Sequence, residues 1–247
     1  MSELRQGSDP DNVLNDVRRA LGRKLPLRPP PLERFIEPFV EAASGALVER
    51  FVLELTALAG HAHRAAFASG FSAPPLTPTE VCGSTANIIE DICRSAAITE
   101  VALSGSAFLA DTGLESELIR RNISVFVPDV GCGHEQLVSR LAVSGAGITA
   151  ADYAIAETGT IVLSSDESNA LLVSLLPPIH IALVGVRQIS ASLDQVISKL
   201  AVERVGRAEP SRSVSFITGP SRTSDVELTL SIGVHGPKEL HVIIVDG

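Results

Sequence analysis

Tryptophan is absent from this chain, and aromatic residues of all kinds make up only 4% of it. Because large aromatic side chains usually contribute much of a buried core, the core here must be built from Ala, Val, Leu and Ile. Hydrophobic residues account for 45% of the 247 residues and charged residues for 20%. This composition is typical of a globular protein with one large domain, or one domain with an extension.

An excess of positive charge is also missing, since the formal net charge is −9 at pH 7. Nucleic-acid-binding proteins usually carry a basic surface, so we expect no nucleic-acid partner. The longest apolar run, Ala170 to Val186, is interrupted by Pro177, Pro178 and His180 and is unsuited to spanning a membrane. The polar, Pro-rich residues 1–34 lack the pattern of a secretion signal, and we therefore expect a cytoplasmic protein.

Cysteine is scarce, with Cys82, Cys93 and Cys132 as its only occurrences and no C-x-x-C pair among them. An odd number of unpaired cysteines argues against a disulfide framework. The same spacing argues against a cysteine-ligated zinc site or iron–sulfur cluster. Any iron–sulfur cluster that acts together with this chain should therefore belong to a partner protein.

The histidines do not have the spacing of a metal site either. His235 and His241 flank Glu239, but they are separated by a turn and a strand start, which does not direct them to one ion. His61 and His63 lie two residues apart in a segment with helical periodicity, which places them on different faces of that helix, at the surface. We predict no metal and no cofactor for this chain.

The first 78 residues differ in pattern from the rest. Three consecutive prolines within Leu25–Leu32 are typical of a stiff, extended linker. Phe35 to Phe67 carries apolar residues at spacings of three and four, which predicts a helix. Pro74, Pro75 and Pro78 end this segment. We predict an N-terminal helical extension with a Pro-rich linker over residues 1–78 and the main domain over residues 79–247.

Beyond residue 83, predicted helices and strands alternate. The almost continuous apolar run from Ile123 to Val127 is typical of a parallel strand that is covered on both faces. Thr158-Gly159 favours a hairpin between two other strands. The predicted strands are 100–103, 123–127, 153–156, 160–164, 179–184, 214–217 and 240–245, and the predicted helices are 84–96, 111–121, 135–143, 189–203 and 224–232. The pattern predicts an α/β fold with a mostly parallel sheet and helices on both faces.

Glu157 is a candidate catalytic residue, since it ends a predicted strand in an otherwise apolar segment. Burial there would raise the pKa of the carboxyl group and restrict its motion. The Glu-x-Gly spacing with Gly159 is similar to that of the nucleophilic glutamate of CoA transferases, although no Gly-rich CoA loop precedes it. The alternative is a structural role, in which Glu157 accepts hydrogen bonds from a neighbouring loop and orders the hairpin.

His180 is the second candidate catalytic residue. It opens the predicted strand 179–184, and Pro177-Pro178 would fix its approach to the sheet. The alternative for such a residue is a histidine packed in the core without a chemical role.

A polar loop between the strand 214–217 and the predicted helix 224–232 is the best candidate for anion binding. Ser224 and Glu227 have capping-box spacing, and the N-terminus of a helix favours an anion. Arg222 can form paired hydrogen bonds with a carboxylate or phosphate. The predicted anion-binding residues are Ser221, Arg222, Thr223, Glu227 and His235. The alternative is an ordinary helix cap beside a solvated arginine.

Two further loops occupy positions where open α/β sheets commonly bind ligands. Ser104-Gly105-Ser106 follows the strand 100–103, and Asp129–His134 follows the strand 123–127. Neither contains the G-x-G-x-x-G pattern of a dinucleotide site, and each also fits a plain connection.

Three segments in order resemble a known family: residues 154–160 (Ala-Ile-Ala-Glu-Thr-Gly-Thr), 176–180 (Leu-Pro-Pro-Ile-His) and 214–245. They resemble the lactate-utilisation protein C family of LUD-domain proteins (LutC/YkgG-like), most clearly from about residue 123 onward. The resemblance implies a fold similar to that of the sugar-phosphate isomerases and CoA transferases (NagB/RpiA-like). It also implies a role in the oxidation of L-lactate to pyruvate together with iron–sulfur partner proteins.

Three functional interpretations remain open. The first is a subunit or accessory protein of L-lactate utilisation that binds a small anionic ligand and acts with iron–sulfur subunits. The second is a stand-alone isomerase or CoA-transferase-like enzyme that uses Glu157 as base or nucleophile. The third is a ligand-sensing regulatory protein, and all three are compatible with a homo-oligomer. In each case we predict that Glu157, His180, Arg222 and His235 share one polar cleft at strand ends.

Overall fold

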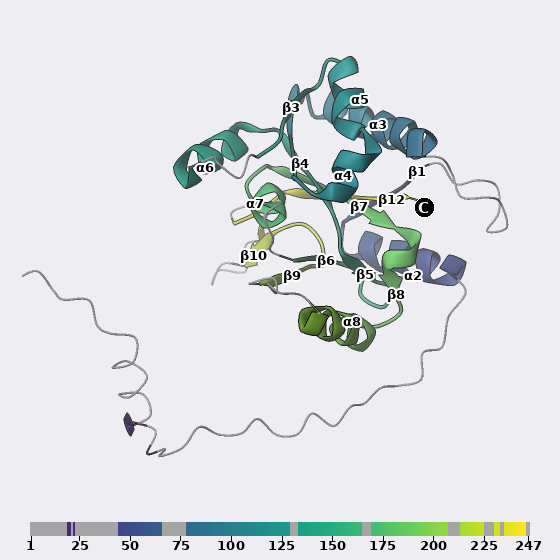
Figure 1. Cartoon of the computed structure of the whole chain (residues 1–247), viewed down its shortest axis with the longest axis vertical. Coiled ribbons are helices and arrows are strands. Elements are labelled where there is room, and N and C mark those ends of the chain that lie inside the picture. The colour runs from purple at the N-terminus through teal and green to yellow at the C-terminus, as the bar shows by residue number, and fades with distance from the viewer. Residues whose placement is uncertain are drawn as a thin grey trace, which may run out of the picture. The chain divides into compact units, whose positions relative to one another are not determined.

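The structure is a computed structural model that describes residues 19–20, 22, 44–65, 78–128, 133–164, 169–206, 213–224, 230–232 and 235–245. The chain divides into two units, Met1–Phe39 and Val40–Gly247. All helices and strands discussed below belong to the second unit (Figure 1).

A six-stranded sheet of order β1-β12-β7-β4-β2-β3 forms the centre of this unit. Every neighbouring pair in it is parallel. Its strands are β1 (His61–Ala65), β2 (Glu100–Leu103), β3 (Ser124–Phe126), β4 (Ala146–Ala150), β7 (Ile179–Gly185) and β12 (Glu239–Val245). β7 and β12 are buried along almost their whole length, as expected for parallel strands covered on both faces. The predicted α/β fold with a mostly parallel sheet is confirmed.

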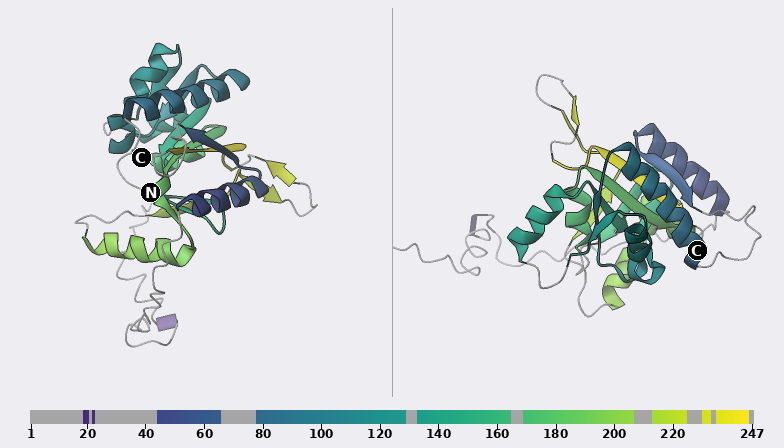
Figure 2. Two further views of the ribbon diagram at one scale, coloured as in Figure 1. Left: turned by 90° about the vertical axis from the view of Figure 1, so that its right-hand side faces the viewer. Right: turned by 90° about the horizontal axis from the view of Figure 1, so that it is seen from above.

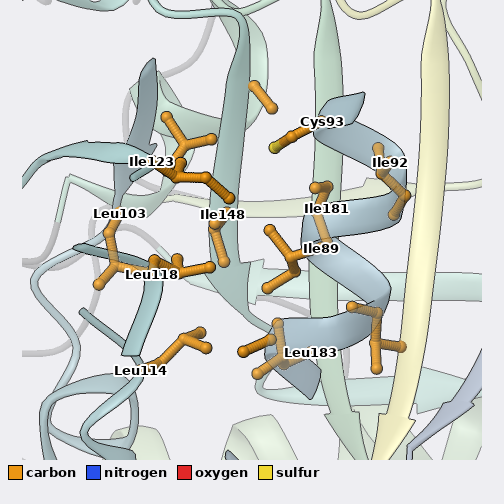
Figure 3. Close-up of a cluster of buried hydrophobic side chains, with 14 of the residues drawn as sticks. Ile89, Ile92, Cys93, Leu103, Leu114, Leu118, Ile123, Ile148, Ile181 and Leu183 are labelled. Atoms are coloured by element: carbon orange, nitrogen blue, oxygen red, sulfur yellow. The ribbon is translucent and has the colours of Figure 1, made fainter. Parts of the chain in front are cut away.

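Helices cover both faces of this sheet (Figure 1). One face packs against α3 (Pro78–Ser95), α4 (Ala107–Thr112) and α5 (Leu114–Arg120), and Figure 3 shows Ile89 and Leu118 meeting Ile148 and Ile181 of the sheet in this cluster. The other face packs against α2 (Ser44–Ala57), α6 (His134–Val143) and α7 (Ala170–Leu175). Among the described residues, no helix is both long and apolar enough to cross a bilayer.

A second sheet of four strands, in the order β8-β5-β6-β9, packs beside α2 and α7. Its strands are β5 (Tyr153–Ile155), β6 (Thr160–Ser164), β8 (Ile189–Ser190) and β9 (Val214–Ile217). β5 and β6 pair in antiparallel fashion, which confirms the hairpin predicted around Thr158-Gly159. The short 3-10 turn η1 (Val186–Gln188) leads from β7 into β8, and α8 (Leu193–Gly206) covers the outer side of this sheet.

The helix predicted over Phe35–Phe67 is wrong in its second part. Helix α2 ends at Ala57, Ala59 adopts a positive φ of 63°, and the amide of Gly60 donates to Leu55 O at 3.0 Å. The chain then turns into β1, which pairs with β12 at the edge of the central sheet. Phe51 and Leu55 of α2 are fully buried in the cluster between the two sheets. Residues 44–65, which the sequence assigned to an extension, thus lie in the second unit; residues 35–43 lie outside the described residues.

The helix predicted over residues 224–232 is also wrong. The structure has the antiparallel strands β10 (Arg222–Ser224) and β11 (Leu230–Ile232), and Figure 2 shows this pair at the periphery of the unit. The capping-box spacing of Ser224 and Glu227 was misleading. A period of two, which favours a strand over a helix, is visible in the alternation of apolar and polar residues at Val226, Leu228, Leu230 and Ile232.

Helix α8 begins four residues later than predicted, because Ile189–Ser190 forms strand β8. Its start has a capping pattern that the sequence reading missed. The amide of Gln195 lies 3.5 Å from Ser192 Oγ, and the amide of Ala191 donates to Gln195 Oε1 at 3.0 Å. Ser192 Oγ thus lies next to an amide that a helix start leaves unpaired, and Gln195 holds the residue that precedes Ser192. The predicted helix 111–121 is divided into α4 and α5 at Gly113, which has a φ of 70°.

Candidate functional site

The amino-terminal ends of β7 and β12 carry two cavities on opposite faces of the central sheet. In this register Glu239 pairs with Ile179, and the next pair is Leu240 with His180. Side chains alternate between the faces of a strand, so these two pairs face opposite ways. His180 and Leu240 line a cavity of about 220 Å³, whereas Ile179 and Glu239 line one of about 400 Å³.

His180 is the most unusual polar residue of the smaller cavity. Its side chain is only 1% exposed, and burial lowers its pKa to about 3, so the ring is neutral at pH 7. Nε2 lies 2.9 Å from Thr149 Oγ1 on the neighbouring strand β4. Nδ1 is buried and has no hydrogen-bond partner among the residues that the structure describes. A buried ring nitrogen without a partner is costly, which marks this position as one where a ligand can supply the missing bond.

The walls of the smaller cavity come from three separate parts of the chain. Ser174 and Leu175 of α7 form one side, and residues 216–221 and 235–237 form the others. Backbone hydrogen bonds hold these segments together: Ser221 N donates to Pro237 O at 2.9 Å, and Lys238 N donates to Pro178 O at 2.8 Å. The structure therefore places three of the predicted site residues, His180, Ser221 and His235, around one cavity.

A chain of threonine hydroxyls connects the hairpin that follows Glu157 to this cavity. Thr158 Oγ1 lies 2.7 Å from Thr160 Oγ1, which in turn lies 2.8 Å from Thr218 Oγ1. Thr218 lines the cavity. The segments 154–160, 176–180 and 214–221, far apart in sequence, thus meet in one region.

Glu157 itself does not line the cavity. Its exposed carboxylate accepts a hydrogen bond from the amide of Leu193 at 2.7 Å. Leu193 is the first residue of α8, where a carboxylate satisfies an unpaired amide and interacts favourably with the helix dipole. This hydrogen bond fits the alternative in which Glu157 has a structural role and accepts hydrogen bonds from a neighbouring part of the chain.

Arg222 points elsewhere as well, because its Nη2 donates to Leu58 O at 2.8 Å, just beyond the end of α2. The residue is exposed and does not line the cavity. Since a strand occupies residues 222–224, the helix N-terminus on which the predicted anion site depended is not there. Glu227 and the side chain of Thr223 lie outside the described residues.

A cluster of histidines at the sheet edge was missed by the sequence reading. His61 and His241 are neighbours on β1 and β12, with ring centroids 4.6 Å apart. His63 Nε2 lies 3.0 Å from His241 Nδ1, and His241 Nε2 lies 3.2 Å from Glu239 Oε2. Burial and the two neighbouring histidines lower the pKa of His63 to about 4. The sequence analysis had expected a helix here, with His61 and His63 on different faces. Residues 61–65 form a strand instead, and in a strand His61 and His63 lie on the same face.

A third cavity, of about 140 Å³, lies at the carboxyl ends of the central strands and is lined in part by Ser106, Asp152 and Gln188. Ser106 Oγ accepts the amide of Leu109 at 3.3 Å and thereby caps α4. Asp152 Oδ2 accepts the amide of Ser164 at 2.6 Å. These contacts fit the plain-connection alternative for the loop 104–106; residues 129–132 lie outside the described part of the chain.

Two of the three cysteines are described. Cys82 and Cys93 are free thiols buried on α3, and burial raises the pKa of Cys93 to about 11. A buried thiol with a raised pKa is a poor nucleophile and metal ligand. Cys132 lies outside the described residues.

A family model of the LUD domain matches residues 48–245. The chain belongs to the LUD-domain family. The match begins within α2, so α2 and β1 are part of the LUD domain.

Among curated relatives, this LUD-domain chain is 36% identical over 134 residues to lactate utilization protein C of Halalkalibacterium halodurans, covering 54% of this chain and 57% of that protein. It spans about half the length of the first curated relatives it matches. Over longer regions it is 30% identical to the uncharacterized protein YkgG of Escherichia coli, covering 94% and 96% of the two chains. It is 27% identical to lactate utilization protein C of an Exiguobacterium species, with 95% of each chain covered.

A solved structure supports the fold. The crystal structure of a DUF162 family protein from Deinococcus radiodurans superposes with a TM-score of 0.52 at 20% sequence identity. The superposition covers 83% of this chain and 99% of the other. At this identity the likeness concerns the fold alone.

Proposed function

We propose that this chain takes part in L-lactate utilisation as a subunit or accessory protein, and that it binds a small anionic ligand in the cavity beside His180. The observation that carries the proposal is His180 itself, which lines this cavity and whose buried Nδ1 has no hydrogen-bond partner among the described residues. The cavity occurs where the three segments 154–160, 176–180 and 214–221 meet.

The size and chemistry of the cavity favour a small hydroxy acid or keto acid. Its volume of about 220 Å³ is below the roughly 300–1,000 Å³ of sites for drug-sized ligands. In a neutral imidazole one nitrogen donates and the other accepts. Depending on the role that Thr149 takes at Nε2, His180 Nδ1 either donates to a ligand oxygen or accepts from a ligand hydroxyl. L-Lactate offers both kinds of group.

The side chains around His180 supply further hydrogen bonds suited to a carboxylate. Ser221 and Thr218 contribute hydroxyl groups, and His235 contributes an exposed imidazole from the opposite loop. Leu175, Phe216 and Leu240 form apolar parts of the lining, which suits the carbon skeleton of a short acid. Small-molecule sites are usually lined by mainly apolar side chains with a few polar groups among them.

The names of the relatives support the pathway. Several of them are called lactate utilization protein C, and we extend lactate utilisation from them to this chain. The oxidation of lactate requires electron acceptors, and the two buried, widely separated cysteines offer no cluster ligands among the described residues. We therefore place iron–sulfur clusters in partner subunits, and we place the assembly in the cytoplasm.

Ligand binding is tested by calorimetric titration of the purified full chain with L-lactate and with pyruvate. His180→Gln keeps a polar side chain of similar volume but moves the hydrogen-bonding atom, and binding should weaken by about 1–3 kcal/mol, the range for a lost hydrogen bond at a buried partner. His134→Gln, at the exposed start of α6, is the matched control and should bind as the unmodified chain does. Equal affinities of both variants for whichever acid binds would contradict the site.

The pathway is tested separately by growth. A strain that lacks this gene should lose growth on L-lactate as carbon source and regain it with the unmodified gene. Complementation by His134→Gln but not by His180→Gln would connect the cavity to the pathway. Full growth on lactate without the gene would contradict the proposed pathway, whatever the titrations show.

A further inference from the structure

The spacing of the histidines along the chain predicted no metal site, but the strand pairing brings three of these side chains together. We propose that His61, Glu239 and His241 form a binding site for a divalent first-row transition-metal ion such as Zn²⁺, with His63 as the residue that orients His241. This site lies on the face of the central sheet opposite to the His180 cavity. It is therefore independent of the proposed ligand site.

The sheet register brings the ligands together. His61 of β1 and His241 of β12 are directly paired on adjacent parallel strands. Glu239 precedes His241 by two residues and His63 follows His61 by two, so all four side chains lie on one face. The convergence is a property of the backbone pairing and does not depend on a loop conformation.

The spacing of the ligand atoms is close to what an ion requires. One ligand atom from each of His61, Glu239 and His241 can be chosen so that all lie within 4.8 Å of one another. Ligands at about 2.0–2.2 Å from a tetrahedral zinc ion lie about 3.4 Å apart. The pair His241 Nε2 and Glu239 Oε2, at 3.2 Å, already has this separation. The His61 ring is stacked on that of His241, with 19° between the ring planes, so His61 must turn out of this stack to direct a ring nitrogen at the ion. His61 and Glu239 are exposed, which leaves room for that rotation.

His63 supplies the outer contact that metal-binding histidines usually have. Its Nε2 lies 3.0 Å from His241 Nδ1. When His241 uses Nε2 for the ion, its Nδ1–H donates to His63 and the ring is held in that orientation. Such outer partners fix the tautomer and ring position of a ligating histidine, and they distinguish a built site from a chance group of exposed residues.

The donor set determines the class of ion and leaves room for a further ligand. Two imidazoles and one carboxylate suit zinc and its first-row neighbours rather than calcium or magnesium, which prefer oxygen ligands. Three protein ligands leave one position of a tetrahedral ion for water or a small molecule. His61 and Glu239 are exposed, which leaves that position open to solvent.

The site is tested with untagged, metal-free protein and Zn²⁺ alone, using competition with a chromophoric chelator. We expect one high-affinity equivalent. Because loss of an outer partner typically costs about 10–100-fold in affinity, His63→Gln should weaken binding by that factor. His61→Gln and Glu239→Gln each remove a ligand and should weaken binding by more than about 100-fold. His134→Gln should bind as the unmodified chain does.

Co²⁺ gives a second measurement, because its visible absorption reports the ligand set and geometry directly. The unmodified chain should show the intense bands of a four- or five-coordinate site with nitrogen ligands, and His61→Gln should lose them. His61 and Glu239 are exposed, so their variants should fold normally, as circular dichroism will check. Unchanged zinc affinity in both His61→Gln and Glu239→Gln, or no stoichiometric binding by the unmodified chain, would overturn the proposal.

Discussion

His180 on β7 and Thr149 on β4 are joined by a hydrogen bond of 2.9 Å between Nε2 and Oγ1, and both side chains are buried. The two residues are diagonal neighbours, since His180 pairs in register with Gly147. Thr149 thereby fixes the ring of His180 and leaves Nδ1 as the ring nitrogen without a hydrogen-bond partner among the described residues. The two central strands of the sheet hold the polar group on which the proposed ligand site depends.

The pH dependence of stability should report the burial of His180. Its pKa is about 3 in the folded chain and about 6.5 when unfolded, so unfolding between these values takes up a proton. The contribution of His180 to the free energy of unfolding is therefore fully present above about pH 6.5, and it is lost as the pH falls toward the pKa of the folded chain. Urea denaturation between about pH 4 and 6 should show a slope about 1.4 kcal/mol per pH unit steeper for the unmodified chain than for His180→Gln.

The histidine control separates this effect from general acid sensitivity. The slope is compared with that of His134→Gln, which makes the same replacement at an exposed position. Parallel curves for the unmodified chain and His180→Gln would mean that His180 is accessible to protons in the folded state.

Much of the fold followed from local pattern. The strand 100–103 has the predicted bounds, and the hairpin around Thr158-Gly159 and the strand at 214–217 were found as well. Their apolar runs are bounded by clear turn residues. The strand at 146–150 was missed because its sequence, Ala-Gly-Ile-Thr-Ala, has little side-chain volume and no strong alternation. The strand at 61–65 was missed because its histidines carry no apolar signal, and only pairing with β12 makes it a strand.

Only the part of the candidate site that depends on local sequence was predictable. His180 was placed by its position at the start of an apolar strand, which is local information. The direction in which Glu157 and Arg222 point depends on α8 and on the end of α2, both distant in sequence. The histidine cluster depends on strand neighbours 180 residues apart, His61 and His241. Such contacts cannot be read from spacing along the chain.

Replacement of Glu157 distinguishes a structural role from a chemical one. Because its carboxylate accepts the amide of Leu193 at the start of α8, Glu157→Ala should lower the free energy of unfolding by about 0.5–2 kcal/mol, the usual cost of losing a cap. Glu157→Gln keeps an oxygen acceptor and should cost less. Chemical denaturation measures both.

Growth on lactate then decides the chemical role of Glu157. A glutamate that only caps α8 leaves growth normal in Glu157→Gln. A glutamate that acts as base or nucleophile, as the second interpretation of the sequence holds, requires that growth be abolished although the protein folds. The two measurements on one variant therefore separate the alternatives.

A structural role and a ligand-binding role of Arg222 can be distinguished in a similar way. Its guanidinium donates to Leu58 O and connects β10 to the end of α2, so Arg222→Ala should lower the free energy of unfolding by about 0.5–1.5 kcal/mol, the net contribution of such a bond. If Arg222 also binds the anionic ligand, its loss should weaken binding by about 1.5–3 kcal/mol, the range for hydrogen bonds to charged groups. Calorimetric titration beside denaturation measures both effects, and unchanged binding would remove Arg222 from the ligand site.

Gly159 provides the most sharply controlled test of how the hairpin is held. It has a φ of 61°, and a Cβ added there would lie 2.6 Å from Leu55 Cα and even nearer to Leu55 N, both backbone atoms of α2. Gly113 has a similar φ of 70°, but no atom lies within 4 Å of its added Cβ. Gly113→Ala should therefore cost only the left-handed conformation, about 1–2 kcal/mol.

Gly159→Ala should cost clearly more than Gly113→Ala, because helix backbone, unlike the end of a flexible side chain, cannot move aside without shifting α2 as a whole. Phe51 and Leu55 bury α2 between the two sheets, so such a shift would also disturb the core. Urea denaturation of both variants measures the difference. Equal losses would mean that α2 packs less closely on the hairpin than the structure shows, and the connection from Thr158 and Thr160 to the His180 cavity would then be looser as well.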